Sequence, residues 1–222
     1  ILNDITLLGA GGAATGGITT LGGIGSGYLY PAFRGQIAYT TPNMNGLQVT
    51  AGIVNPDQGQ DATDQALYDD RFGIEAQATY SFTNGKVWAG VSSYEVSGTV
   101  DYDATAADIG AAFNMGNLGI VAYYYSGEGN GTGNSLNRLA GGMSDPATGG
   151  VDPNLSATGQ ERDQDGGYLQ ATYVIPTGTK LGIAVATSQN DLASGETAGA
   201  TDAHDSNDRW TVGAYHPLTK HL

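Results

Sequence analysis

Apolar and polar residues alternate along most of the chain, and helical periodicity is almost absent. Between Phe72 and Phe82 every second residue is apolar, whereas Glu75 and Gln77 lie among the residues between them. Alternation with a period of two is typical of a β-strand that has one apolar face and one polar face. Trp88 breaks the pattern of the next segment, and the pattern alone does not assign it to either face.

The pattern recurs in nine segments, which we predict to be strands. Turn-forming residues, such as those at 42–46 and 83–85, separate neighbouring segments. The predicted strands are residues 34–41, 47–54, 72–82, 86–96, 107–114, 118–124, 169–175, 181–185 and 210–214.

The connections between these segments alternate between short and long. The long ones are rich in Gly, Asp, Asn and Ser, and they are residues 55–71, 97–105, 126–165 and 190–208. Such sorting predicts an up-and-down antiparallel barrel with two unlike ends, since the Greek-key connections of a soluble sandwich are not sorted in this way. A loop as long as 126–165 also fits poorly in a compact soluble domain.

The composition of the two faces favours a barrel that spans a membrane. One face carries Ala, Val, Ile, Leu and Tyr without charge, and the other stays polar along its length, which suits a water-filled lumen. Aromatic residues near the strand ends are candidates for the girdle at the membrane interfaces. They are Tyr39, Tyr80, Phe82, Phe113, Tyr173 and Trp210. The predicted fold class is therefore all-β, an antiparallel up-and-down transmembrane β-barrel.

Composition and charge exclude several other classes. There are 8 Lys and Arg against 22 Asp and Glu, and the net charge of −14 argues against binding to nucleic-acid phosphates. No apolar run reaches the length of a transmembrane helix, and the absence of Cys excludes disulfide scaffolds and Cys nucleophiles. The chain starts at Ile1 with neither a Met nor a signal peptide, so we expect a piece of a longer or processed protein.

Three stretches carry a resemblance to a known family. Residues 28–43 (YLYPAFRGQIAYTTPN), the return at residues 46–49 (GLQV) and the ending at residues 212–220 (VGAYHPLTK) resemble the general diffusion porins of Gram-negative outer membranes. The resemblance implies a 16-strand barrel of the porin type, of which about nine strands are present here. It also implies a homotrimer and a third loop folded into the lumen.

In that register residues 1–222 form a single partial barrel domain. Residues 1–33 are similar to the end of the constriction loop, and residues 34–222 hold the strands, with short turns alternating with long extracellular loops. The early strands and the terminal aromatic residue of the family are missing, so we expect that this piece alone does not insert, because its open edges would face lipid. The implied partners are outer-membrane lipid, lipopolysaccharide, and small hydrophilic solutes and ions.

Polar-face residues are the candidates for the wall of the pore. The resemblance implies that Arg34 faces acids on the inward loop, and opposed charges of this kind order permeating solutes. Alternatively, Arg34 only anchors a strand end at the interface. Asp4 is the only acidic residue before Arg34, so the inward loop offers few acids to oppose Arg34. The candidate pore-lining or constriction residues are Asp4, Arg34, Gln36, Gln48, Arg71, Glu75, Gln77, Lys86 and Asp108.

No motif predicts a catalytic site, a cofactor or a well-formed metal site. Residues 161–166 (ERDQDG) resemble the first half of an EF-hand loop, but the twelfth position would be Thr172 instead of Glu. The acidic connections could bind divalent cations weakly, although solvated loops that keep the mouth soluble are the simpler interpretation.

The leading hypothesis is an outer-membrane porin, a channel for passive diffusion of small hydrophilic solutes and ions. Its acidic mouths predict a mild cation preference. One alternative is a secreted β-rich adhesin or surface-layer protein with acidic, divalent-binding loops. A barrel enzyme is a second alternative; it requires a Ser–His pair, for which only His204 lies in a suitable loop. We expect a non-enzymatic protein of the bacterial outer membrane.

Overall fold

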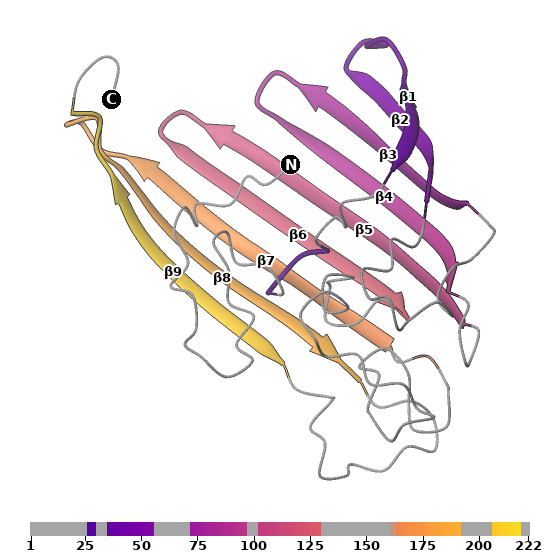
Figure 1. Ribbon diagram of the computed structural model, residues 1–222. Coiled ribbons are helices and arrows are strands. Elements are labelled where there is room, and N and C mark those ends of the chain that lie inside the picture. The colour runs from indigo at the N-terminus through magenta and orange to yellow at the C-terminus, as the bar shows by residue number, and fades with distance from the viewer. Residues whose placement is uncertain are drawn as a thin grey trace.

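A computed structural model describes residues 26–29, 35–55, 72–96, 102–129, 161, 163–191 and 206–218. Within these residues nine strands form one antiparallel sheet, and each strand pairs with its neighbours in sequence (Figure 1). The strands are β1 (Gln36–Thr40), β2 (Leu47–Val54), β3 (Gly73–Phe82), β4 (Gly85–Val96), β5 (Tyr102–Met115), β6 (Leu118–Glu128), β7 (Asp163–Val174), β8 (Lys180–Asn190) and β9 (Asn207–Tyr215). The predicted all-β fold and the number of strands are confirmed.

Short turns join β1 to β2, β3 to β4, β5 to β6 and β7 to β8 at one end of the sheet, which we call the short-turn end (Figure 1). Asn45 and Gly46 have φ values of 54° and 98° in the first of these turns. The side chain of Asn43 accepts a hydrogen bond of 2.7 Å from the Gly46 N–H. Asn and Gly adopt positive φ at low cost, which explains why these residue types mark the turns in the sequence.

Several strands extend farther toward the opposite end than the alternating pattern predicts. β5 begins at Tyr102 instead of residue 107, β6 ends at Glu128 instead of residue 124, and β7 begins at Asp163 instead of residue 169. The connection between β4 and β5 is therefore 97–101, shorter than the predicted 97–105. The physical reason is that a ladder needs only backbone N–H and C=O groups, so pairing continues where apolar side chains have ended.

The cross-strand register assigns each side chain to one of two faces, because directly paired residues point to the same side of a sheet. Trp88 pairs with Thr79 and with Gly110, and the same row continues to Tyr123 and Tyr168. We call this the inner face, since residues 26–29 lie on it (the short indigo segment across the sheet in Figure 1). The residues between them form the outer face.

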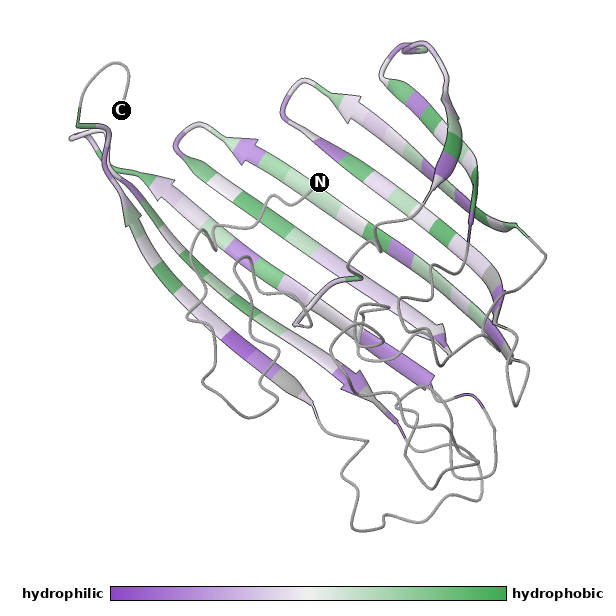
Figure 2. Cartoon of the chain, viewed as in Figure 1, coloured by the Kyte–Doolittle hydropathy of each residue, from purple (hydrophilic) through white to green (hydrophobic). Residues whose placement is uncertain are grey.

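The outer face is apolar near the short turns and acidic near the opposite end. Ile37, Ile109 and Val212 are 76%, 59% and 68% exposed on it, and Figure 2 shows apolar and polar positions alternating along the strands. Toward the opposite end the same face carries Glu95, Asp103, Glu128, Asp163, Asp165 and Asp208. The expectation of an outer face without charge is therefore wrong at the far ends of the strands, most of which the sequence pattern left in loops, although Glu95 lies within the predicted strand 86–96.

The buried core of the described residues is small and lies on the inner face. Tyr28 is 1% exposed and packs with Val121, Tyr168 and Ala186, which come from β6, β7 and β8. Partly buried Trp88 and the neighbouring Ala112 and Tyr123 surround this cluster. The segment 26–29 thus supplies the cover that a single sheet otherwise lacks on this side.

Candidate functional site

A row of aromatic rings crosses the middle of the inner face. The rings of Trp88 and Tyr123 are stacked at 6.4 Å between centroids with 23° between planes, and those of Tyr123 and Tyr168 at 5.6 Å and 27°. Gly110 lies in the row between Trp88 and Tyr123, and a Cβ atom at Gly110 would overlap the indole ring. The absence of a side chain at Gly110 therefore lets the indole lie across β5. This arrangement assigns Trp88, which the sequence pattern left unplaced, to the inner face.

Charged side chains lie beside this row. The Nζ atom of Lys86 is 5.4 Å from the centroid of the Trp88 ring, within the range of a cation–π contact. Asp108 pairs with Gly90, where its carboxylate occupies the space that a side chain at Gly90 would take. Both charges are thus held close to the wall of the sheet by neighbouring residues.

Hydrogen bonds fix the segment 26–29 to the inner face. The Gly27 N–H donates to Ser188 Oγ at 2.8 Å, and the Tyr125 hydroxyl donates to the same oxygen at 2.9 Å. Ser188 and Tyr125 are fully buried. Gly27 has a φ of 89°, and a Cβ atom there would come within 2.6 Å of the Ala186 Cβ atom. The close approach of the segment to β8 therefore requires glycine at this position.

Most of the predicted wall residues share the inner face. The strand register places six of them in rows of this face, and they are Gln36, Gln48, Glu75, Gln77, Lys86 and Asp108. Asp4, Arg34 and Arg71 lie outside the described residues, as do most of the acidic connections and His204. The expectation of an evenly polar face is wrong, because the aromatic row and the cluster around Tyr28 occupy its centre.

The predicted girdle residues all lie on the outer face. Five of them lie near the short turns, and they are Tyr39, Tyr80, Phe82, Phe113 and Tyr173. The centroid of the Phe82 ring is 6.2 Å from that of Tyr80 and 5.6 Å from that of Phe113. Trp210 is farther from the short turns, and it is 78% exposed. Five of the six residues therefore form a band at one end of the sheet.

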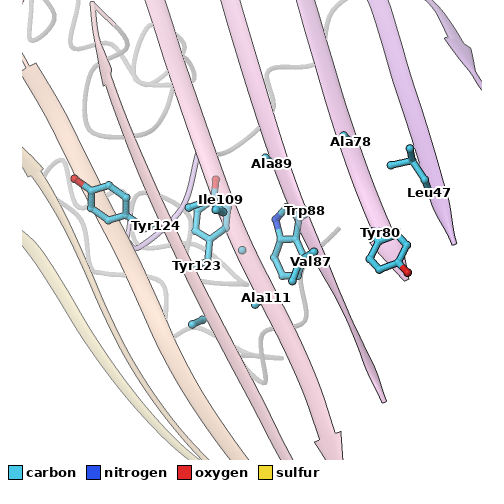
Figure 3. A pocket seen from close by; sticks show the side chains of 12 residues that line it. Leu47, Ala78, Tyr80, Val87, Trp88, Ala89, Ile109, Ala111, Tyr123 and Tyr124 are labelled. Carbon is cyan, nitrogen blue, oxygen red and sulfur yellow. The ribbon is translucent and has the colours of Figure 1, made fainter. Parts of the chain in front are cut away.

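A shallow groove of about 470 Å³ crosses the outer face of β2 to β6 (Figure 3). Its floor consists of alanines, with larger side chains such as Tyr80 and Tyr124 beside them. The lining is almost entirely apolar, so it offers a hydrophilic solute few hydrogen-bond partners. The candidate site for polar solutes is therefore the inner face.

Sequence reasoning missed the residues that hold the inward segment. They are Tyr28, Tyr123, Tyr125, Tyr168 and Ser188. Strict alternation from Val87 and Ala89 would have placed Trp88 on the polar face. In the same way, the run of three tyrosines at 123–125 requires at least one tyrosine to point inward. The pairing of Gly27 with Ser188 has no local signal, because it joins distant parts of the chain.

The described part of the chain contains no helix that is long and apolar enough to cross a membrane. Within the same residues, no group of three or more His, Asp and Glu side chains is arranged to bind a metal ion.

The fold is shared with a solved porin. The anion-selective porin from Comamonas acidovorans is similar to this chain, with a TM-score of 0.56 and 13% sequence identity over 83% of this chain and 45% of that chain. This chain thus spans less than half the length of that porin, and its nine-strand sheet corresponds to about half of the barrel. No curated protein matches the sequence.

A family model described as Gram-negative porin matches residues 2–222, which is nearly the whole chain. Porins are channels and have no enzymatic activity, so the family replaces both the barrel-enzyme alternative and the adhesin alternative. The chain belongs to the Gram-negative porin family, whose place is the bacterial outer membrane.

Proposed function

We propose that this chain forms part of the wall of a water-filled channel through which small hydrophilic solutes and ions diffuse passively. The contrast between the two faces of one sheet carries the proposal. The outer face exposes large apolar residues such as Ile37 and Val212, whereas the inner face presents Gln36, Glu75 and Gln77. Lipid on one side and water on the other account for this contrast, as in other transmembrane barrels.

We infer that residues 1–33 end the loop that narrows this channel, within a single partial barrel domain of residues 1–222. The contacts of Gly27 and Tyr28 with the inner face support the inference, because a segment held there reduces the open cross-section. The proposed lining or constriction residues are Asp4, Arg34, Gln36, Gln48, Arg71, Glu75, Gln77, Lys86 and Asp108.

A homotrimer in contact with lipopolysaccharide is part of the same proposal. The trimer is proposed by analogy with the porin family. The outward aromatic side chains support a membrane-interface role for the band that includes Tyr80, Phe82 and Phe113. Their position beside the short turns fits one interface of a bilayer.

Single-channel recording tests the channel function. The full-length protein in a planar bilayer is expected to produce stepwise increases in current, grouped in threes for a trimer. The same protein, denatured by heat before addition, serves as the control. Channel silence from a folded protein that stays soluble without detergent would contradict the proposal.

We propose a mild cation preference at low salt. The support comes from this chain's own charges, since acids outnumber Lys and Arg by 22 to 8 and raise the local concentration of cations at the mouth. The measurement is the reversal potential across a tenfold KCl gradient, in which the dilute side is expected to become positive. The preference should weaken near 1 M salt, where the screening length falls to about 3 Å. A potential of the opposite sign at low salt would overturn the preference.

The two tryptophans provide a test of the face assignment. Trp210 is 78% exposed on the outer face, whereas Trp88 lies on the inner face. In vesicles of brominated phospholipid that contain the full-length protein, Trp210→Phe is expected to lower the lipid-quenched part of the fluorescence, and Trp88→Phe is expected to leave it unchanged. Stronger lipid quenching of Trp88 than of Trp210 would contradict the assignment.

A further inference from the structure

The positive charges of the described strands include two at the short-turn end. Lys86 is the second residue of β4 and Lys180 is the first residue of β8, so both are next to short turns. Both also belong to the inner face, because Lys86 pairs with Ser81 and Ala112, and Lys180 pairs with Val174. In and directly beside the four short turns, the described residues include no Asp or Glu.

Acidic residues gather at the opposite end. Glu95 pairs directly with Asp103, and Glu128 pairs directly with Asp163. These residues lie on the outer side of the rim, where their negative potential still acts on ions that approach the mouth. Glu95 is nine residues after Lys86 along β4, which corresponds to about 30 Å at the rise of a β-strand.

The middle of the inner face carries charges of both signs. Glu75 and Asp108 lie there on β3 and β5, and Arg209 lies there on β9. Two of these charges are negative and one is positive, so the single net negative charge that they leave does not remove the difference between the two ends. The charge of the described wall is thus positive near the short turns, mixed in the middle and negative at the far rim.

Contacts keep one of the two lysines on the wall. The ammonium of Lys86 lies over the Trp88 ring at 5.4 Å, and the ring itself lies against Gly110 and is stacked on Tyr123. A cation–π contact of this kind biases the side chain toward this position. The charge of Lys86 therefore remains near the short-turn mouth.

We propose that this charge separation makes the channel rectify, so that it conducts more when its acidic end is positive; the inference rests on the proposed channel function. With that polarity, cations enter through the acidic rim and anions enter past Lys86 and Lys180, so ions accumulate in the lumen. With the reverse polarity each ion must enter through the end that repels it, and the lumen is depleted.

Screening sets the salt dependence of the effect. The Debye length is about 10 Å at 0.1 M and about 3 Å at 1 M. At 0.1 M the two ends, about 30 Å apart along a strand, act on ions as separate charged zones that reach into the lumen. At 1 M the charges are screened within the wall, and the difference between the two polarities should vanish.

Current–voltage curves of the full-length protein in planar bilayers test the proposal. The expected ratio of the currents at opposite voltages of equal size is at least ~1.5 at 0.1 M KCl and ~1 at 1 M. Orientation is determined with Asn117→Cys in a short turn, because a bulky thiol reagent modifies it from one chamber only. These 222 residues contain no Cys that would compete, and any Cys elsewhere in the full-length protein is first replaced by Ser.

The double variant Lys86→Gln with Lys180→Gln is expected to lose most of the asymmetry, whereas Lys86→Arg with Lys180→Arg should keep it. A linear curve at 0.1 M from a conducting wild-type channel would overturn the inference, and so would full asymmetry in the glutamine variant. Absence of any conductance would overturn the proposed function itself, and the inference with it.

Discussion

Replacing Tyr28 by alanine is expected to release the inward segment and to raise the unit conductance, with added current noise. Tyr28 is 1% exposed among Val121, Tyr168 and Ala186, and removal of a buried aromatic ring typically costs about 3–5 kcal/mol. Since each tenfold change in an equilibrium constant corresponds to about 1.4 kcal/mol, the ratio of docked to undocked segment falls by roughly two to four orders of magnitude. Single-channel recording of the full-length variant measures the effect.

The control for this experiment lies on the other face of the same region. Tyr124 is adjacent in sequence to Tyr125 but is 51% exposed on the outer face, so Tyr124→Ala should leave the conductance unchanged. Ser188→Ala is an independent test, because it removes the oxygen that accepts hydrogen bonds from Gly27 and Tyr125. Leaving buried donors without an acceptor costs about 1–3 kcal/mol, so we expect a rise in conductance smaller than that of Tyr28→Ala. Wild-type conductance in a correctly folded Tyr28→Ala channel would contradict the prediction that Tyr28 holds residues 26–29 on the inner face.

A single methyl group at Gly110 is expected to destabilise the protein strongly. The Cβ atom of Gly110→Ala would overlap the Trp88 indole, which cannot move away without leaving Tyr123 and Lys86. Overpacking usually costs about 1–3 kcal/mol, and we expect a loss at or above the top of that range because the ring is held on several sides. The urea midpoint of the full-length protein in detergent micelles measures the loss.

A double variant separates this clash from a general effect on β5. In the Trp88→Ala background the ring is gone, so Gly110→Ala should have little further effect. Gly116→Ala provides the comparison, since nothing lies within 4 Å of that position and only its φ of 62° opposes a side chain. Equal losses for Gly110→Ala with and without Trp88 would show that the indole is not the cause.

The sequence predicts the sheet well because hydrophobic alternation reports directly which side of a strand faces apolar surroundings. The order of the strands and the position of the turns follow from residues such as Asn84 and Gly116, and the structure agrees with both. Strand ends are predicted poorly. Asp103 and Asp163 are paired in the ladder, yet acidic residues in a sequence of this kind are typical of loops.

The candidate site is only partly predictable, because its parts are brought together by tertiary contacts. Polar wall residues such as Glu75 and Gln77 can be assigned from alternation. The packing site of Tyr28 cannot be assigned in this way, since it combines side chains from β6, β7 and β8. Trp88 is also ambiguous in sequence, because an aromatic ring suits either the membrane side or a packed inner surface, and only the gap left by Gly110 decides between them.

The hydrogen bond between Gly27 and Ser188 also sets an order of events in folding. Every strand pairing joins sequence neighbours, so the entropy lost in closing each hairpin is modest. The contact of Gly27 with Ser188 spans 161 residues, far more than any single hairpin. The site where residues 26–29 pack is formed by β6, β7 and β8 together. We therefore expect the segment to dock after these strands have assembled. The cover that residues 26–29 provide on the inner face is therefore completed late, once most of the described sheet is in place.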